Sequence, residues 1–179
     1  KELILRHGHQ GVKRGKNSEV ASKIQRGVSK MPDNKFTTWV HGTSMQIEYP
    51  NRITSVRHTG PFVRIEGSEG QNTWVHFPIP TPTVSNGTKV QANAALVRFR
   101  TRPKATVHEI IVYDGEKRIA EHMDINLTGD HLDARFEVPG SPEVNHGLNI
   151  TVGVLFGNNA PDVRAMQVEI VGVGVEFQG

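Results

Sequence analysis

The chain contains no cysteine, and this absence excludes disulfide bonds and thiol chemistry. It also lacks any run that approaches the ~18 apolar residues of a membrane-spanning helix. Residues 1–6, KELILR, provide no sustained apolar stretch like that of a secretory signal. Without cysteine and without such a signal, we expect a cytoplasmic protein that does not associate with a membrane.

Sequence motifs of the common enzyme classes are absent as well. There is no Gly-x-Ser-x-Gly elbow, no phosphate-binding loop, no Gly-x-Gly-x-x-Gly fingerprint and no His-Glu-x-x-His pair. Glu48 and Glu66 are candidates for the paired carboxylates of a glycoside hydrolase, but nothing in the sequence fixes the distance between them. We therefore expect a protein that is not an enzyme and that holds no cofactor.

Positive charge is concentrated in the first 30 residues. The net charge is +3 overall and +6 over residues 1–30, which leaves −3 for the rest. Contacts with nucleic acid are therefore expected only through residues 1–30. A short helix over 18–29, with Ser18 as its N-cap, is compatible with this segment. We divide the chain into a basic N-terminal arm, 1–35, and a domain, 36–179.

From Phe36 onward, apolar and polar residues alternate with a period of two, which is typical of half-buried strands. Turn signals such as Asp114-Gly115 separate the strands. Many short strands at this spacing indicate a sandwich or a barrel. We predict an all-β, antiparallel β-sandwich that is jelly-roll-like. The residues expected between its sheets are Val63, Ile65, Val97, Phe99, Phe136, Ile150, Val152 and Val154.

Two segments of the predicted sandwich depart from regular alternation. The last strand, 166–177, changes its apolar face part-way along, which requires a bulge or bend where Gly172 and Gly174 occur. The segment Phe77–Thr83 contains three prolines, which remove backbone donors. We therefore expect it to be an extended edge or a crossover rather than a central strand.

The tripeptide Trp-Val-His occurs twice, at Trp39–His41 and Trp74–His76. Residues i and i+2 of a strand share a face. Because Val75 and Phe77 form a core pair, Trp74 and His76 are expected to point outward. One interpretation places Trp39, His41, Trp74 and His76 on one outer face that binds a sugar or another planar ligand. The alternative is that both indoles are buried, as tryptophan is on average.

A cluster of acidic residues and one histidine is a weak candidate for a metal site. Carboxylates in a turn are suitable oxygen ligands for Ca²⁺. The spacing does not match an EF-hand loop, and carboxylates are common in turns for local hydrogen-bonding reasons. We therefore expect no metal, and the weak candidates are Asp124, Asp130, His131 and Asp133.

The order of several short motifs resembles a microbial family of small uncharacterised β-sandwich proteins, a domain of unknown function. The motifs are Trp39-Val40-His41-Gly42, Trp74-Val75-His76-Phe77-Pro78-Ile79-Pro80-Thr81-Pro82, Val112-Tyr113-Asp114-Gly115, Leu127-Thr128-Gly129-Asp130 and Gly147-Leu148-Asn149-Ile150. The resemblance covers residues 36–177 and leaves out the arm, which favours Met31 as a natural start. It implies no activity.

Two classes of function remain open at this point. The first is a non-catalytic binding or interaction module, with carbohydrate as the leading ligand. The alternative is a self-assembling, shell-like structural protein whose basic arm contacts a second subunit or nucleic acid. The second hypothesis predicts a homo-oligomer that forms through the arm, and it rests on analogy between folds.

Overall fold

A computed structural model describes residues 34–179. The helix predicted over 18–29 and nearly all of the predicted arm, 1–35, lie outside the described residues. Residues 34–179 belong to one compact unit. Within residues 34–179, the only helical segments are three 3₁₀ turns. They are η1 (Gly42–Ser44), η2 (Pro50–Arg52) and η3 (Val163–Met166).

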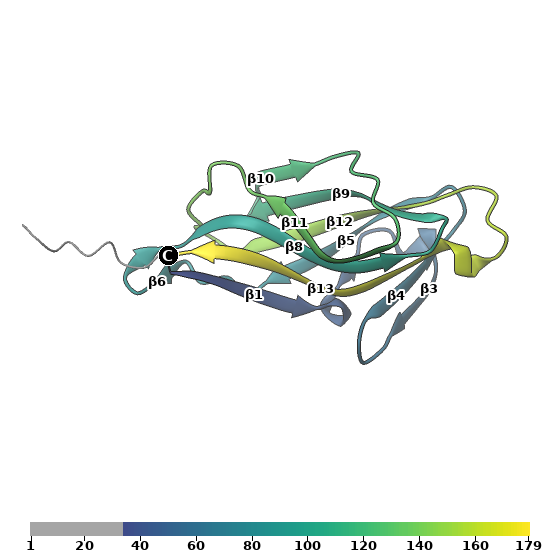
Figure 1. The fold of residues 1–179 in the computed structure, drawn as a ribbon, viewed down its shortest axis with the longest axis horizontal. Coiled ribbons are helices and arrows are strands. Elements are labelled where there is room, and N and C mark those ends of the chain that lie inside the picture. The colour runs from purple at the N-terminus through teal and green to yellow at the C-terminus, as the bar shows by residue number, and fades with distance from the viewer. Residues whose placement is uncertain (1–33) are drawn as a thin grey trace, which may run out of the picture. The chain divides into compact units, whose positions relative to one another are not determined.

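Two antiparallel sheets form the body of the protein (Figure 1). The six-stranded sheet has the order β11-β8-β13-β4-β3, with β1 also paired to β13. Its strands are β1 (Lys35–His41), β3 (Ile53–His58), β4 (Val63–Gly67), β8 (Gln91–Thr101), β11 (Asp130–Glu137) and β13 (Gln167–Gln178). The five-stranded sheet has the order β10-β9-β12-β5-β2. Its strands are β2 (Gln46–Ile47), β5 (Asn72–Ile79), β9 (Ala105–Asp114), β10 (Lys117–His122) and β12 (Leu148–Phe156).

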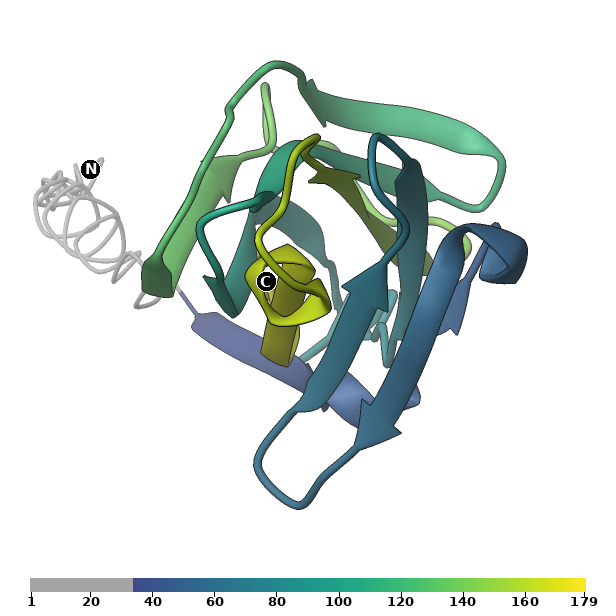
Figure 2. The ribbon, with the colours of Figure 1, turned by 90° about the vertical axis from the view of Figure 1, so that its right-hand side faces the viewer.

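A small hairpin of β6 (Val84–Ser85) and β7 (Thr88–Lys89) completes the described strands. Figure 2, turned by 90° from Figure 1, shows the strands of the two sheets arranged around a common interior. This architecture confirms the predicted all-β antiparallel sandwich. No helix in the described part of the chain is both long and apolar enough to cross a membrane.

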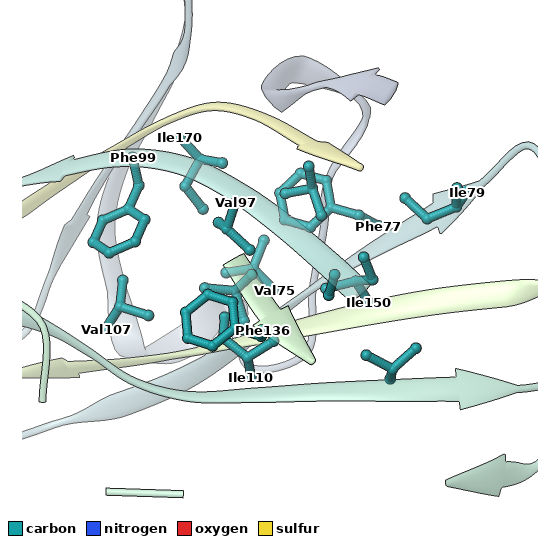
Figure 3. Packing of buried hydrophobic residues seen from close by; sticks show 14 of the residues in the cluster. Val75, Phe77, Ile79, Val97, Phe99, Val107, Ile110, Phe136, Ile150 and Ile170 are labelled. Atoms are coloured by element: carbon teal, nitrogen blue, oxygen red, sulfur yellow. The ribbon is translucent and has the colours of Figure 1, made fainter. Parts of the chain in front are cut away.

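The core lies between the two sheets. Figure 3 shows Val97 and Phe99 of β8 in one cluster with Val75 of β5 and Val107 and Ile110 of β9. Burial of such side chains is the main favourable term in folding, at about 1.5–3 kcal/mol each. All eight residues that the alternation predicted to be buried are buried. The alternation therefore gave the correct strand register.

The two irregular segments have clear structural explanations. The register of β13 against β8 shifts between Ile170 and Gly172, so that Val171 forms the bulge that the change of apolar face requires.

The proline-rich segment begins inside β5. This strand continues to Ile79, and Pro78 pairs with Asn149 of β12. The prediction of an edge is correct for this stretch, because β2 pairs with β5 only at Val75 and His76. No strand pairs with Pro78 on that side, so the backbone N–H that proline lacks is not needed there for a hydrogen bond between strands.

Candidate functional site

The two Trp-Val-His segments lie in different sheets. Trp39 is on β1 of the six-stranded sheet, and Trp74 is on β5 of the five-stranded sheet. Each tryptophan points away from the core, so the two face opposite sides of the sandwich. The prediction that they share one face is therefore wrong. The chain changes sheets at η1, immediately after β1, and no local pattern in the sequence shows this.

Neither indole is buried. Trp39 is 44% exposed, and Trp74 is partly exposed. The alternative interpretation, that both tryptophans belong to the core, is therefore also wrong. The assignment of Trp39, His41, Trp74 and His76 to ligand binding remains a prediction, now divided between two surfaces.

The outer face of the five-stranded sheet carries a shallow hollow of about 300 Å³. Strands β5, β9, β10 and β12, together with the residues after β2, supply its lining. The lining residues are Glu48, Tyr49, Trp74, His76, Glu109, Ile111, Tyr113, Arg118, Glu121 and Thr151. The hollow therefore combines three aromatic side chains, one histidine and several charged groups on a single face.

Trp74 is held across the neighbouring strand by a carboxylate. In the sheet, Trp74 of β5 pairs with Gly153 of β12, and Gly153 pairs with Glu109 of β9. The indole Nε1 donates a hydrogen bond of 2.7 Å to Glu109 Oε2. A Cβ on Gly153 would lie 2.9 Å from Glu109 Cβ and 3.1 Å from Oε2. The absence of a side chain at 153 therefore makes room for this bond over β12.

Glu109 is itself almost fully buried, at 3% exposure. Burial of a carboxylate is costly unless a partner compensates for the lost solvation. The indole N–H is the side-chain donor that compensates here. Next to it, His108 lies at a bulge in β9, and its Nε2 is buried without a hydrogen-bond partner among the described residues. Glu109, which lines the hollow, and the adjacent His108 therefore place two buried polar groups next to Trp74 and Gly153.

Tyr49 extends the aromatic surface at the edge of the hollow. Its ring meets Trp74 edge-on, with 5.8 Å between the ring centroids. The guanidinium carbon of Arg52 lies 4.0 Å from the centroid of the Tyr49 ring, a distance typical of a cation–π contact. Glu48, through a hydrogen bond and its negative charge, raises the pKa of Tyr49.

A polar chain crosses the hollow beside the aromatic pair. His76 Nε2 lies 3.1 Å from Glu48 Oε2, and His76 Nδ1 lies 2.9 Å from Thr151 Oγ1. Asn149 Nδ2 donates to the same hydroxyl at 3.3 Å. Both ring nitrogens of His76 are thus occupied, which fixes the orientation of the imidazole. On the far side, Arg118 forms an ion pair with Glu121.

The hairpin that carries Tyr113 and Arg118 is anchored to the start of β12. Asp114 accepts backbone hydrogen bonds from Asn145 at 2.9 Å, His146 at 2.9 Å and Gly147 at 3.1 Å. Burial raises the pKa of Asp114, but these three bonds lower it by more, and the net pKa lies below its usual value. The Asp114 carboxylate therefore fixes the β9–β10 side of the hollow to the segment that precedes β12.

Other sequence candidates do not come together. Glu48 lines the hollow, whereas Glu66 lies on β4 of the other sheet and accepts a hydrogen bond of 2.6 Å from Gln167. They are therefore not a catalytic pair. Within residues 34–179, no three histidine, aspartate or glutamate side chains are grouped to hold a metal ion.

The weak metal candidates take part in other interactions. Asp130 pairs with Arg100 at 3.5 Å, and Asp133 lies 3.9 Å from Arg98. The ring of His131 stacks on Phe99. Asp124 occupies a turn with a positive φ of 54°. Asp130, His131 and Asp133 of β11 thus contact side chains of β8, whereas Asp124 lies outside both sheets.

Sequence reasoning missed most of the hollow. Glu109, Thr151, Tyr113 and Arg118 belong to strands that are distant in sequence and adjacent only through pairing. One local signal was available. A glutamate at position 109, directly before the apolar run Ile110–Val112, indicates a polar group with a specific partner.

Residues 31–179 match the model of a family described as a family of unknown function, DUF6623. No curated protein matches the sequence. A low affinity xylan binding module from Roseburia intestinalis, CBM86, is similar in fold, with a TM-score of 0.50 and 12% identity over 79% of this chain and 96% of that chain. A family 29 carbohydrate binding module from Piromyces equi gives a TM-score of 0.45 and 7% identity over 80% of this chain and 91% of its own. A cyclase from Fischerella sp. TAU gives a TM-score of 0.45 and 10% identity over 78% of this chain and 87% of its own.

Proposed function

The chain belongs to this family of unknown function, and from this premise we propose that it is a non-catalytic carbohydrate-binding module. Its ligand would occupy the hollow on the outer face of the five-stranded sheet. The observation that carries the proposal is the partly exposed indole of Trp74, held by Glu109 in the hollow and flanked by Tyr49.

The chemistry of the hollow suits a sugar ring. A pyranose presents C–H groups on its faces and hydroxyl groups around its edge. The faces pack against the rings of Trp74 and Tyr49, which provide apolar area with a polar edge. The hydroxyl groups find charged partners in Glu48 and Arg118, whose second carboxylate oxygen and remaining N–H groups are free of the contacts to His76 and Glu121. The openness of the hollow allows a polymer to pass along the face instead of entering a closed pocket.

The carboxylates of the hollow favour binding over hydrolysis. A glycoside hydrolase needs one carboxylic acid and one carboxylate placed on either side of the scissile bond. Here Glu109 accepts from Trp74, Glu48 contacts His76 and Glu121 pairs with Arg118. Each carboxylate is thus engaged by a donor, so none of them is set up as a proton donor to a leaving group.

The similarity in fold to the xylan binding module CBM86 supports a polysaccharide ligand. This support is an analogy between folds, because function depends on the side chains of the site. Xylan is therefore the first polysaccharide to test. The alternative function, self-assembly through the arm, stays a prediction, because the arm lies outside the described residues.

The test is affinity electrophoresis on soluble xylan, β-glucan and galactomannan, together with a glycan array. We expect the intact protein to be retarded by at least one polymer. Trp74→Ala should weaken binding by about 1–3 kcal/mol, the usual contribution of one stacking contact. Val163→Ala, at an exposed site on η3, is the matched control and should bind normally. An intact protein that binds no glycan, or a Trp74→Ala variant with unchanged affinity, would overturn the proposal.

A further inference from the structure

The outer face of the six-stranded sheet carries a second exposed tryptophan in a hollow of its own. The hollow has a volume of about 320 Å³. It is lined by Trp39, Val40, His41, Arg98, Val171 and Gly172. None of these residues lines the hollow that contains Trp74. The two hollows lie on opposite faces of the sandwich and are structurally independent.

Two glycines form a flat support under the indole of Trp39. Trp39 pairs with Gly174 of β13, and His41 pairs with Gly172. A Cβ on Gly174 would lie 2.7 Å from Trp39 Cδ2, whereas the hydrogen of glycine leaves room for the ring. The six-membered part of the indole thus rests directly on the β13 backbone. Trp39 is 44% exposed, so the face of its ring that points away from β13 is available for stacking with a ligand.

Polar groups border this platform in fixed positions. His41 Nδ1 lies 2.9 Å from Thr43 Oγ1, which leaves Nε2 without a partner among the described residues. Arg98 lies across Gly172, and its Nε donates a hydrogen bond of 2.6 Å to the Leu132 carbonyl. The terminal nitrogens of Arg98 remain directed to a partly open surface, 3.9 Å from Asp133 at their nearest approach.

The charge of this face argues against a polyanion as the ligand. Three of its other arginines are paired with carboxylates: Arg64 with Glu169 at 2.6 Å, Arg100 with Asp130 at 3.5 Å and Arg135 with Glu176 at 2.9 Å; Arg57 on β3 is the exception. A nucleic-acid surface requires unneutralised positive charge along its length. A neutral ligand with one flat apolar face and hydroxyl groups at its rim fits the platform better. That description is met by a pyranose ring.

We propose that the Trp39 platform is a second carbohydrate-binding site, so that one molecule binds two glycan segments on opposite faces. Trp39 stacks on a pyranose ring, while His41 and Arg98 bind its hydroxyl groups. The ligand class rests on the proposed function, whereas the residues are separate from those of the first site. Two sites that face in opposite directions allow one protein to bridge two polymer chains, because simultaneous binding needs only that both faces are accessible.

The experiment compares the full chain with Trp39→Ala, Trp74→Ala and the double variant. Xylan, β-glucan and galactomannan, and hexasaccharides of each, are the probes. Calorimetry should give two hexasaccharides per intact protein and one for each single variant. The intact protein should also precipitate the polymer by bridging, and both single variants should lose this activity. Val163→Ala is the control and should behave as the intact protein does.

Two further variants separate stacking from folding. Trp39→Tyr keeps a flat ring and should retain two sites. Gly174→Ala keeps the tryptophan but places a Cβ 2.7 Å from Trp39 Cδ2 and 2.8 Å from the Thr38 carbonyl oxygen, so the indole and this part of β1 must both shift. It should lower the stoichiometry to one while circular dichroism shows a folded sandwich.

Each outcome of the titration is decisive. One hexasaccharide per intact protein, with all binding lost in Trp74→Ala, would overturn the second site and leave the first. All binding lost in Trp39→Ala and retained in Trp74→Ala would overturn the Trp74 hollow as the binding site and would leave the Trp39 platform as a single site, without bridging. An absence of binding by the intact protein to every probe would overturn both.

Discussion

Trp74 and Glu109 are joined by a hydrogen bond of 2.7 Å that passes over the strand between them. The bond fixes the indole on the sheet, and it compensates a carboxylate that is only 3% exposed. Gly153, on the intervening strand, is what leaves room for it. The orientation of the main stacking residue in the proposed site therefore depends on three strands at once.

Gly153→Ala is expected to weaken polysaccharide binding without unfolding the protein. The new Cβ would lie 2.9 Å from Glu109 Cβ, so the glutamate must shift and its bond to Trp74 is lost. Overpacking of this kind costs about 1–3 kcal/mol of stability. The measurement is affinity electrophoresis together with the tryptophan emission spectrum. Gly60→Ala is the control, because a Cβ there meets nothing within 4 Å. Unchanged affinity in Gly153→Ala would show that the position of the indole does not matter.

Adjacent residues of β12 should differ sharply in their contribution to stability. Phe156 is fully buried, whereas Leu155 is 41% exposed on the outer face. Phe156→Ala is expected to cost about 3–5 kcal/mol, since it removes a large core side chain and leaves a cavity. Leu155→Ala should cost less than about 1 kcal/mol. Urea unfolding of both variants measures the difference. Equal costs would contradict the register of β12.

Asp114 should stabilise the fold in a manner that depends on pH. Its folded pKa is lowered, so its stabilisation is complete above the unfolded pKa of about 3.9 and is lost as the pH falls through the folded pKa. Asp114→Asn removes the charge and one acceptor for the backbone N–H groups of residues 145–147. We expect it to cost about 1–3 kcal/mol at pH 7.

Thermal unfolding of both proteins between pH 7 and pH 2 tests this prediction. The difference between the native protein and Asp114→Asn should shrink at the acid end. A difference that stays constant with pH would mean that the carboxylate charge is not responsible.

A protein that comprises residues 31–179 should fold with the stability of the full chain. The hydrophobic cluster found in the structure spans Phe36 to Phe177, and the family match covers the same part of the chain. Circular dichroism and thermal unfolding of the two proteins measure this. A truncated protein that fails to fold would show that residues 1–30 contribute to the core. Comparison of native masses by light scattering tests the separate hypothesis that the arm mediates self-association.

The sequence was informative wherever the physical cause is local. Alternation with a period of two depends only on the geometry of an extended chain, so it predicted the strands of the body, the eight core residues and the bulge in β13. The same geometry gave one interpretation in which Trp39 and Trp74 point outward, but burial of both indoles stayed open as the alternative until the structure showed their exposure. Membership in a family of unknown function was also correctly predicted.

Only the tertiary structure decided which sheet each strand joins. The 3₁₀ turn after β1 sends the chain to the opposite sheet, and this places the two Trp-Val-His segments on opposite faces. Trp74, Glu109 and Gly153 are distant in sequence, and they meet only because β5, β12 and β9 are neighbours. Strand pairing is set by the burial of all the apolar faces together, so the composition of the binding surface does not follow from any short stretch of the sequence.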